Sequence, residues 1–247
     1  MFDTHCHLNS LYALSASELS SCLNSKHYYL AVSSKQSDWD STLAFSRAHE
    51  LVMPALGIHP WFVSSHDVNV LTELEVRLQT NEVNALGEIG LDFQKKYIAD
   101  KSKQLEFCHY QLALAERYRL PVSLHIIKAH NEALALLKQF NVTGVVHGLG
   151  ASTQIAQSYL SLGFKVGING VSCRSNARRY HELIDFCGID NLVLETDFPN
   201  IILPEHNRAA LSDIKIIADL IAKRLQLDYL QVIAKTDYNA RQIFLNT

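Results

Sequence analysis

Short apolar and β-branched runs recur along the chain, and most of them end in a polar residue. Runs of this length, bounded by polar clusters, are typical of buried strands. The pattern predicts eight strands, at Met1–His7, Tyr28–Ser33, Leu51–His59, Val83–Ile89, Pro121–Ile126, Thr143–His147, Gly163–Ile168 and Asn191–Thr196.

The segments between these strands have the spacing of amphipathic helices. Apolar side chains recur on one face of Lys101–Tyr118, at Leu105, Cys108, Leu112 and Ala115. A closing helix is predicted from about Ala210 to Leu225, and a last short helix at about Asp237–Leu245. Strand followed by helix, repeated along the chain, indicates a parallel sheet.

The predicted fold class is α/β, a TIM (β/α)8 barrel. The distance from His5 on the first strand to Asp197 after the eighth corresponds to about 27 residues per unit, close to the βα repeat of this barrel. An open doubly wound sheet is the alternative, but the first strand is not followed by the Gly-rich loop of a dinucleotide-binding fold. Without an internal linker or low-complexity segment, residues 1–247 are predicted to form a single domain.

Composition narrows the class of protein. A hydrophobic fraction of 48% and a charged fraction of 19% are ordinary for a soluble protein. No apolar run approaches the ~18 residues of a membrane span, and the first residues do not form a secretory signal. The five cysteines are scattered and form no C-x-x-C pair, which argues against a disulfide scaffold or a thiolate zinc site. We therefore expect a cytoplasmic protein with no membrane partner.

The net charge of −3 provides no general attraction for a polyanion. If the substrate is a nucleic acid, its binding must be local and assisted by metal ions rather than driven by a broad basic face.

Ionisable side chains close many of the predicted strands, at the barrel face where TIM-barrel active sites lie. His5 and His7 are two positions apart on one strand and therefore point to the same side. Taken singly, a strand-end histidine is more often a hydrogen-bonded core residue, Glu88 could cap a helix, and Asp197 could begin a turn. Taken together, the set predicts a metal centre. Its members are His5, His7, His59, Glu88, His125, His147 and Asp197.

Four imidazoles and two carboxylates exceed the needs of one tetrahedral zinc ion. They predict two divalent metal ions (zinc, magnesium or manganese) with Glu88 bridging them. Such a pair activates water and polarises a phosphoryl or carbonyl oxygen. Asp197 would bind one ion and accept the proton of the attacking water, while Glu195, two residues earlier on the same strand face, would orient a ligand.

Five motifs resemble the TatD family of metal-dependent hydrolases, and they occur in order along the whole chain. They are D-T-H-C-H at Asp3–His7, A-L-G-I-H-P at Ala55–Pro60, A-L-G-E-I-G-L-D at Ala85–Asp92, L-P-V-S-L-H at Leu120–His125 and L-E-T-D-F-P at Leu194–Pro199. The resemblance implies a TIM barrel of the amidohydrolase superfamily with a two-metal centre, usually a deoxyribonuclease.

The resemblance also implies roles for individual residues. Asp197 matches the catalytic carboxylate of the family, and His59 matches a pocket histidine that meets substrate or the ligands rather than the metal. The matches to the metal-binding positions are His5, His7, Glu88, His125, His147 and Asp197.

Two departures from the family pattern lie on the substrate side. An Arg is common two residues after the strand-five histidine, where this chain has Ile127 followed by Lys128. Cys-Phe-Ser-Gly is common after the strand-six histidine, where this chain has Gly148–Ala151. Arg binds phosphate in a bidentate way that Lys cannot reproduce, so a phosphodiester substrate is less strongly indicated. Lys128, Arg174 or the run His206–Arg208 could compensate, although each could equally be a solvated loop residue.

The sequence therefore favours a phosphodiesterase of nuclease type acting on DNA or a smaller phosphodiester, with His59, Lys128 and Arg174 as candidate substrate contacts. One alternative is the same centre acting on an ester or amide, because the fold alone does not fix the substrate. Another is a metal-stabilised barrel that no longer catalyses, against which the full ligand set argues. No obligate protein partner is evident.

Overall fold

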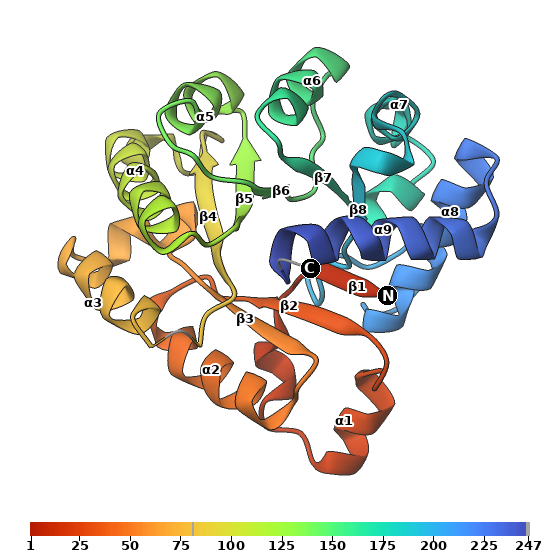
Figure 1. Cartoon of the computed structure of the whole chain (residues 1–247), viewed down its shortest axis with the longest axis horizontal. Coiled ribbons are helices and arrows are strands. Elements are labelled where there is room, and N and C mark those ends of the chain that lie inside the picture. Colours follow the sequence, from red (N-terminus) through yellow and green to blue (C-terminus); the bar gives the residue numbers. More distant parts are fainter. Residues whose placement is uncertain (81, 246–247) are drawn as a thin grey trace.

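A TIM barrel is formed by eight parallel strands that pair in chain order, with helices around them (Figure 1). The computed structural model describes residues 1–80 and 82–245; residues 81, 246 and 247 of the predicted domain lie outside the described part. The predicted fold class is confirmed. The strands are β1 (Phe2–Cys6), β2 (Tyr28–Val32), β3 (Val52–Leu56), β4 (Ala85–Asp92), β5 (Val122–Ile127), β6 (Gly144–Val146), β7 (Lys165–Ile168) and β8 (Leu192–Leu194).

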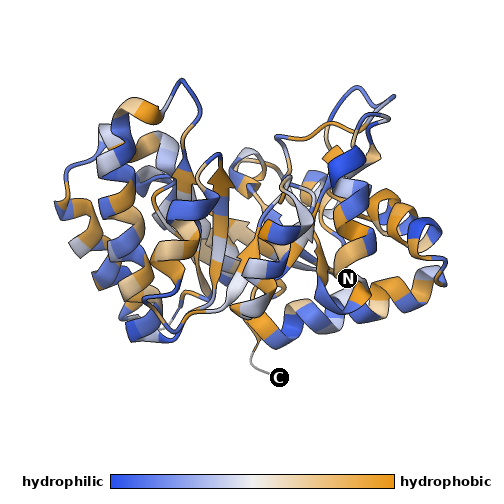
Figure 2. Cartoon of the chain, turned by 90° about the horizontal axis from the view of Figure 1, so that it is seen from above, coloured by the Kyte–Doolittle hydropathy of each residue, from blue (hydrophilic) through white to orange (hydrophobic). Residues whose placement is uncertain are grey.

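The helices alternate with the strands, and those after the first bury one face, whereas the first (Ala16–Cys22) has no buried residue. Hydrophobic and hydrophilic residues therefore intermix along each helix (Figure 2). Among the described residues, no helix is both long and apolar enough to cross a membrane. The helices are α1 (Ala16–Cys22), α2 (Trp39–Ala48), α3 (Asn69–Leu78), α4 (Lys101–Tyr118), α5 (His130–Leu137), α6 (Thr153–Ser161), α7 (Arg178–Cys187), α8 (Ile214–Leu225) and α9 (Tyr229–Phe244).

Two element boundaries that differ from the predictions are those of the last helix and of the fourth strand. The last helix begins at Tyr229 rather than near Asp237, because the Asp228 carboxylate caps it by accepting the N–H groups of Leu230 and Gln231. Strand β4 continues to Asp92 rather than ending at Ile89. This extension adds Asp92 to the residues at the strand ends.

Strands β8 and β1 meet through side chains and loop backbone. The Thr4 hydroxyl donates to the Leu194 carbonyl at 3.0 Å, and the buried Asp3 carboxylate accepts from the N–H and hydroxyl of Thr196. Just beyond, the Asp197 N–H donates to the His5 carbonyl at 2.9 Å. These bonds hold two predicted ligand positions, far apart in the sequence, side by side.

Candidate metal centre

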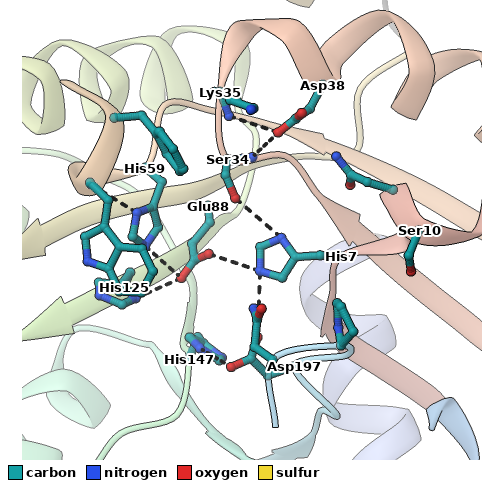
Figure 3. Close-up of a pocket in the computed structure, with 15 residues that line it drawn as sticks. His7, Ser10, Ser34, Lys35, Asp38, His59, Glu88, His125, His147 and Asp197 are labelled. Atoms are coloured by element: carbon teal, nitrogen blue, oxygen red, sulfur yellow. Dashed lines mark hydrogen bonds and ion pairs between the residues drawn. The ribbon is translucent and has the colours of Figure 1, made fainter. Parts of the chain in front are cut away.

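The side chain of Glu88 lies in a cavity of about 540 Å³ at the carboxyl ends of the strands (Figure 3). Five of the other six predicted strand-end residues also line this cavity, and His5 is fully buried next to Glu88. The cavity-lining members are His7, His59, His125, His147 and Asp197.

The two carboxylate oxygens of Glu88 face different histidines. Oε2 lies 3.5 Å from His5 Nε2 and 3.4 Å from His7 Nε2. Oε1 lies 2.9 Å from His125 Nδ1 and 3.4 Å from His59 Nε2. A carboxylate placed in this way can offer one oxygen to each of two cations.

Asp197 contacts His7, which lies on the Oε2 side of Glu88, and also His147. Its Oδ1 lies 3.7 Å from His7 Nε2, and its Oδ2 lies 3.6 Å from His147 Nε2. The rings of His5 and His147 stack with centroids 3.7 Å apart. The structure thus brings together all six residues predicted to bind metal, with potential ligand atoms of His5, His7 and Glu88, and of His5, His147 and Asp197, grouped closely enough to share an ion.

The ring of His5 supports a metal in this position. Its Nδ1 forms a hydrogen bond with Ser123 Oγ at 2.9 Å, while its buried Nε2 has no hydrogen-bond partner in the described part of the chain. A buried polar atom without a partner is destabilising, and the great majority of such atoms are paired. A cation near Glu88 would satisfy this nitrogen, so the donor set fits a metal ion.

His59 is different, although distance alone would group it with Glu88 and His125 as a ligand. Its Nδ1 accepts the backbone N–H of Trp61 at 3.1 Å, so the neutral ring carries its proton on Nε2. Burial lowers the pKa of His59 to about 4, which keeps the ring neutral at ordinary pH. Nε2 therefore points a hydrogen-bond donor at the site instead of a lone pair.

Two carboxylates hold the ring of His125. Glu88 Oε1 lies near Nδ1, and Asp92 Oδ2 lies 3.3 Å from Nε2. Asp92 also accepts the indole N–H of Trp61 at 2.6 Å. Because carboxylates only accept, both ring nitrogens of His125 donate here, and a metal ion near Glu88 would compete with the proton on Nδ1.

The ionised carboxylates of the site favour positive charge on the groups around them. Although burial raises the pKa of a carboxyl group, the surrounding histidines hold the pKa of Glu88 well below its usual range. Burial alone would lower the pKa of His147, but Glu195 and Asp197 raise it to about 10. The pKa of His5 is instead lowered to about 4, mainly by burial. Divalent cations would replace protons on some of these rings, which is how metal binding is coupled to pH.

A buried pocket fixes Glu195, the residue predicted to orient a ligand. Its Oε1 accepts from His147 Nδ1 at 2.8 Å, from the Gly148 N–H at 2.8 Å and from Asn169 Nδ2 at 3.0 Å. A Cβ at Gly167 would lie 2.0 Å from Glu195 Oε2, so only glycine leaves room for this carboxylate. With Nδ1 of His147 donating to Glu195, its Nε2 is free to face Asp197.

The three predicted substrate contacts do not all lie at the cavity. His59 lines the cavity, whereas Lys128 and Arg174 are exposed and are not among the described residues that line it. Their substrate roles stay predictions. His206 contacts the buried Asp213 carboxylate at 3.3 Å. Among the described residues, the lysine or arginine that lines the cavity is Lys35, which no motif in the sequence indicated.

The sequence patterns also did not indicate other residues of the site, chiefly those that form hydrogen bonds with the candidate ligands or with Glu195. Asp92 had a usable signal, because it closes β4, but the strand was predicted to end before it. Ser123 and Asn169 had none, since a serine or asparagine in or after a strand is not distinctive. Their roles depend on partners that are distant in the chain.

Comparisons with known proteins agree with this geometry. A family model described as TatD related DNase matches residues 2–245. An uncharacterized metal-dependent hydrolase of Haemophilus influenzae is 33% identical over 212 residues, which cover 81% of both chains. A 3'-5' ssDNA/RNA exonuclease TatD of Yersinia pseudotuberculosis is 31% identical over 200 residues, 76% of both chains. The crystal structure of YjjV, a TatD homologue from Escherichia coli, has the same fold, with a TM-score of 0.91 and 24% identity over 99% of this chain and 98% of that one.

Proposed function

This chain belongs to the TatD-related DNase family of metal-dependent hydrolases, and we propose that it is a phosphodiesterase of nuclease type that cleaves DNA or a smaller phosphodiester. The observation that carries the proposal is the placement of Glu88, whose two oxygens face separate groups of histidines in an open cavity. The name of the Yersinia relative supports a nucleic-acid substrate.

The same six residues predicted from the sequence would hold two divalent ions, with Glu88 between them. When bound, such ions polarise the phosphoryl oxygen and make water a stronger nucleophile. Two nitrogens are oriented to bind these ions: the Nε2 of His5, which has no hydrogen-bond partner in the described part of the chain, and the Nε2 of His147. The ligand set is His5, His7, Glu88, His125, His147 and Asp197.

Asp197 would accept the proton of the attacking water. Its carboxylate lies between His7 and His147 and faces the cavity, so it can reach a water molecule beside the substrate. Glu195 is buried behind His147 and acts by positioning that ring. The Nε2–H of His59 can donate to a substrate oxygen, which favours an anionic group such as a phosphate.

The test is metal analysis of the purified protein combined with an activity screen. The substrates are single-stranded DNA, bis(4-nitrophenyl) phosphate and 4-nitrophenyl acetate, each assayed with zinc, magnesium or manganese. We expect up to two ions per chain and hydrolysis of the two phosphodiesters. Asp197→Asn serves as the inactive reference, and Asp219→Asn, an exposed change on α8, as the matched control.

Two results would contradict the proposal. Hydrolysis of the acetate ester without hydrolysis of either phosphodiester would assign the metal centre to carbonyl chemistry. Metal binding without activity on any of the three would favour a metal-stabilised barrel that no longer catalyses. A cytoplasmic location remains part of the proposal and is tested by fractionation.

A further inference from the structure

We propose that a surface beside the cavity binds the single-stranded polynucleotide that continues beyond the bond being cleaved. This inference rests on the proposed function and narrows its substrate to a chain of several nucleotides. The surface, called here the loop surface, follows β2, β3 and β4 and consists of Lys35, Trp61, Phe62, Lys96 and Tyr97. Three of its members, Lys35, Trp61 and Phe62, also line the cavity, so the surface is continuous with the site.

The aromatic part of the loop surface is fixed in place. Trp61 is 43% exposed, yet its indole N–H donates to the buried Asp92 and its ring stacks on Tyr97 with centroids 5.1 Å apart and planes 14° apart. An exposed aromatic ring that is already held loses little conformational entropy when a ligand packs on it. Aromatic side chains beside a cationic groove are what single-stranded nucleic acids bind, since every base has a face to stack.

The cations of the loop surface accompany these rings. Lys96 Nζ lies 4.9 Å from the centroid of the Tyr97 ring, and Lys35 Nζ lies 5.6 Å from that of Phe62. Within the described part of the chain, neither ammonium group forms an ion pair. Lys101, close by, is instead paired with Glu132 at 2.6 Å. Lys35 and Lys96 are therefore the ammonium groups that remain available for phosphates.

Two carboxylates beside the loop surface, Asp38 and Asp92, are buried and already accept hydrogen bonds. Asp38 accepts the backbone N–H groups of Ser34 and Lys35, and Asp92 accepts from Trp61 and His125. Figure 3 places Lys35 across the cavity from Asp197 and His147, with Glu88 between them. A strand with one phosphate at the metal centre can thus extend toward Lys35 and the aromatic rings. This local site explains how a chain of net charge −3 could bind a polyanion.

The test compares binding and hydrolysis in the metal-loaded protein. Binding of a labelled ten-nucleotide single strand is measured by fluorescence anisotropy in the Asp197→Asn background, with and without the double change Lys35→Gln and Lys96→Gln. Hydrolysis of the same strand and of bis(4-nitrophenyl) phosphate is measured without Asp197→Asn. The matched control is Lys223→Gln, an exposed lysine on α8 on the opposite side of the barrel (Figure 1).

We expect the double variant to weaken binding of the strand by about 10-fold and to lower the slope of log affinity against log salt by about 0.7 for each lysine. The KM for the strand should rise similarly. Because Lys35 lines the cavity, the internal reference is the single variant Lys96→Gln, whose KM for bis(4-nitrophenyl) phosphate, which is too short to reach Lys96, should not change. Unchanged affinity and salt slope would overturn the loop surface even if the strand is cleaved. Lysine-dependent binding without cleavage of any phosphodiester would support the surface and overturn the proposed nuclease activity.

Discussion

Glu88 separates the site into two halves that use the same residue types in different ways. The His5 half contains His5, His7, His147 and Asp197, and the His125 half contains His59, His125 and Asp92. In the His5 half, the Nε2 of His5 has no hydrogen-bond partner among described residues, and the Nδ1 of His147 donates to Glu195. In the His125 half, a backbone N–H makes His59 a donor, and two carboxylates engage both nitrogens of His125.

Distance from Glu88 does not decide the role of a histidine here. The hydrogen bond formed by the ring nitrogen that faces away from Glu88 decides whether Nε2 can bind a cation or donates a hydrogen bond. His5 and His59 both place Nε2 within 3.5 Å of a Glu88 oxygen. His5 can present a lone pair there, because the Ser123 hydroxyl can accept a proton from Nδ1, whereas His59 cannot, because the Trp61 N–H fixes its proton on Nε2. Four changes test the two halves, from the one that affects both to the one that affects a single ring.

The largest effect is expected for Glu88→Gln, which removes the charge shared by the two halves. The amide keeps the shape but presents an NH2 group to one pair of histidines. Metal content and kcat should fall together, with kcat lower by about 10³-fold or more. Metal analysis and a phosphodiester assay measure both, with Glu132→Gln, a change at a partly exposed residue of α5, as the control. A variant that still binds two ions like the parent would refute the bridging role.

Asp197→Asn acts on the His5 half alone. It keeps an oxygen for a metal but loses the basicity, so kcat should fall by about 10²-fold or more while KM changes far less. Steady-state kinetics of Asp197→Asn and Glu195→Gln are compared directly. If Asp197→Asn retains near-parent kcat and Glu195→Gln abolishes it, the two roles are assigned the wrong way round.

Asp92→Asn acts on the His125 half alone. Removing the charge beside His125 Nε2 should lower metal affinity or activity by about 10- to 100-fold, as for other partners that orient a ligand. A titration with the metal ion, followed by the phosphodiester assay, measures this. Asp190→Asn, an exposed change, is the control. Full metal affinity in Asp92→Asn would mean that His125 is held by Glu88 alone.

Ser123→Ala is expected to have the smallest effect. It removes the hydroxyl at 2.9 Å from His5 Nδ1, a neutral partner, so the loss of metal affinity should be about 10-fold or less and smaller than for Asp92→Asn. Metal titration of both variants, with thermal unfolding as a check of folding, ranks them. A larger loss in Ser123→Ala would show that the His5 half depends more strongly on its outer partner.

Much of the fold and of the ligand set follows from local patterns in the sequence. Apolar runs followed by helical spacing predicted eight strands and a TIM barrel, because periodicity is a property of neighbouring residues. Since parallel strands bring their carboxyl ends to one face, the strand-end rule predicted that His5, Glu88, His147 and the other ligands would meet there. The structure brings them together as expected.

The role of each side chain at that face depends on partners that are distant in the chain. Ser123 is 118 positions from His5, and Asp3 is 193 from Thr196, so no local pattern could show these bonds. Close approach of strands positions Ser123, since a Cβ at Gly87 would lie 2.8 Å from the Cβ of Ser123. The direction of a side chain also depends on its neighbours in space, which is why Lys35 lines the cavity while the exposed Lys128 does not. The sequence pattern predicted the candidate ligands, and packing between distant strands determined their hydrogen-bond partners.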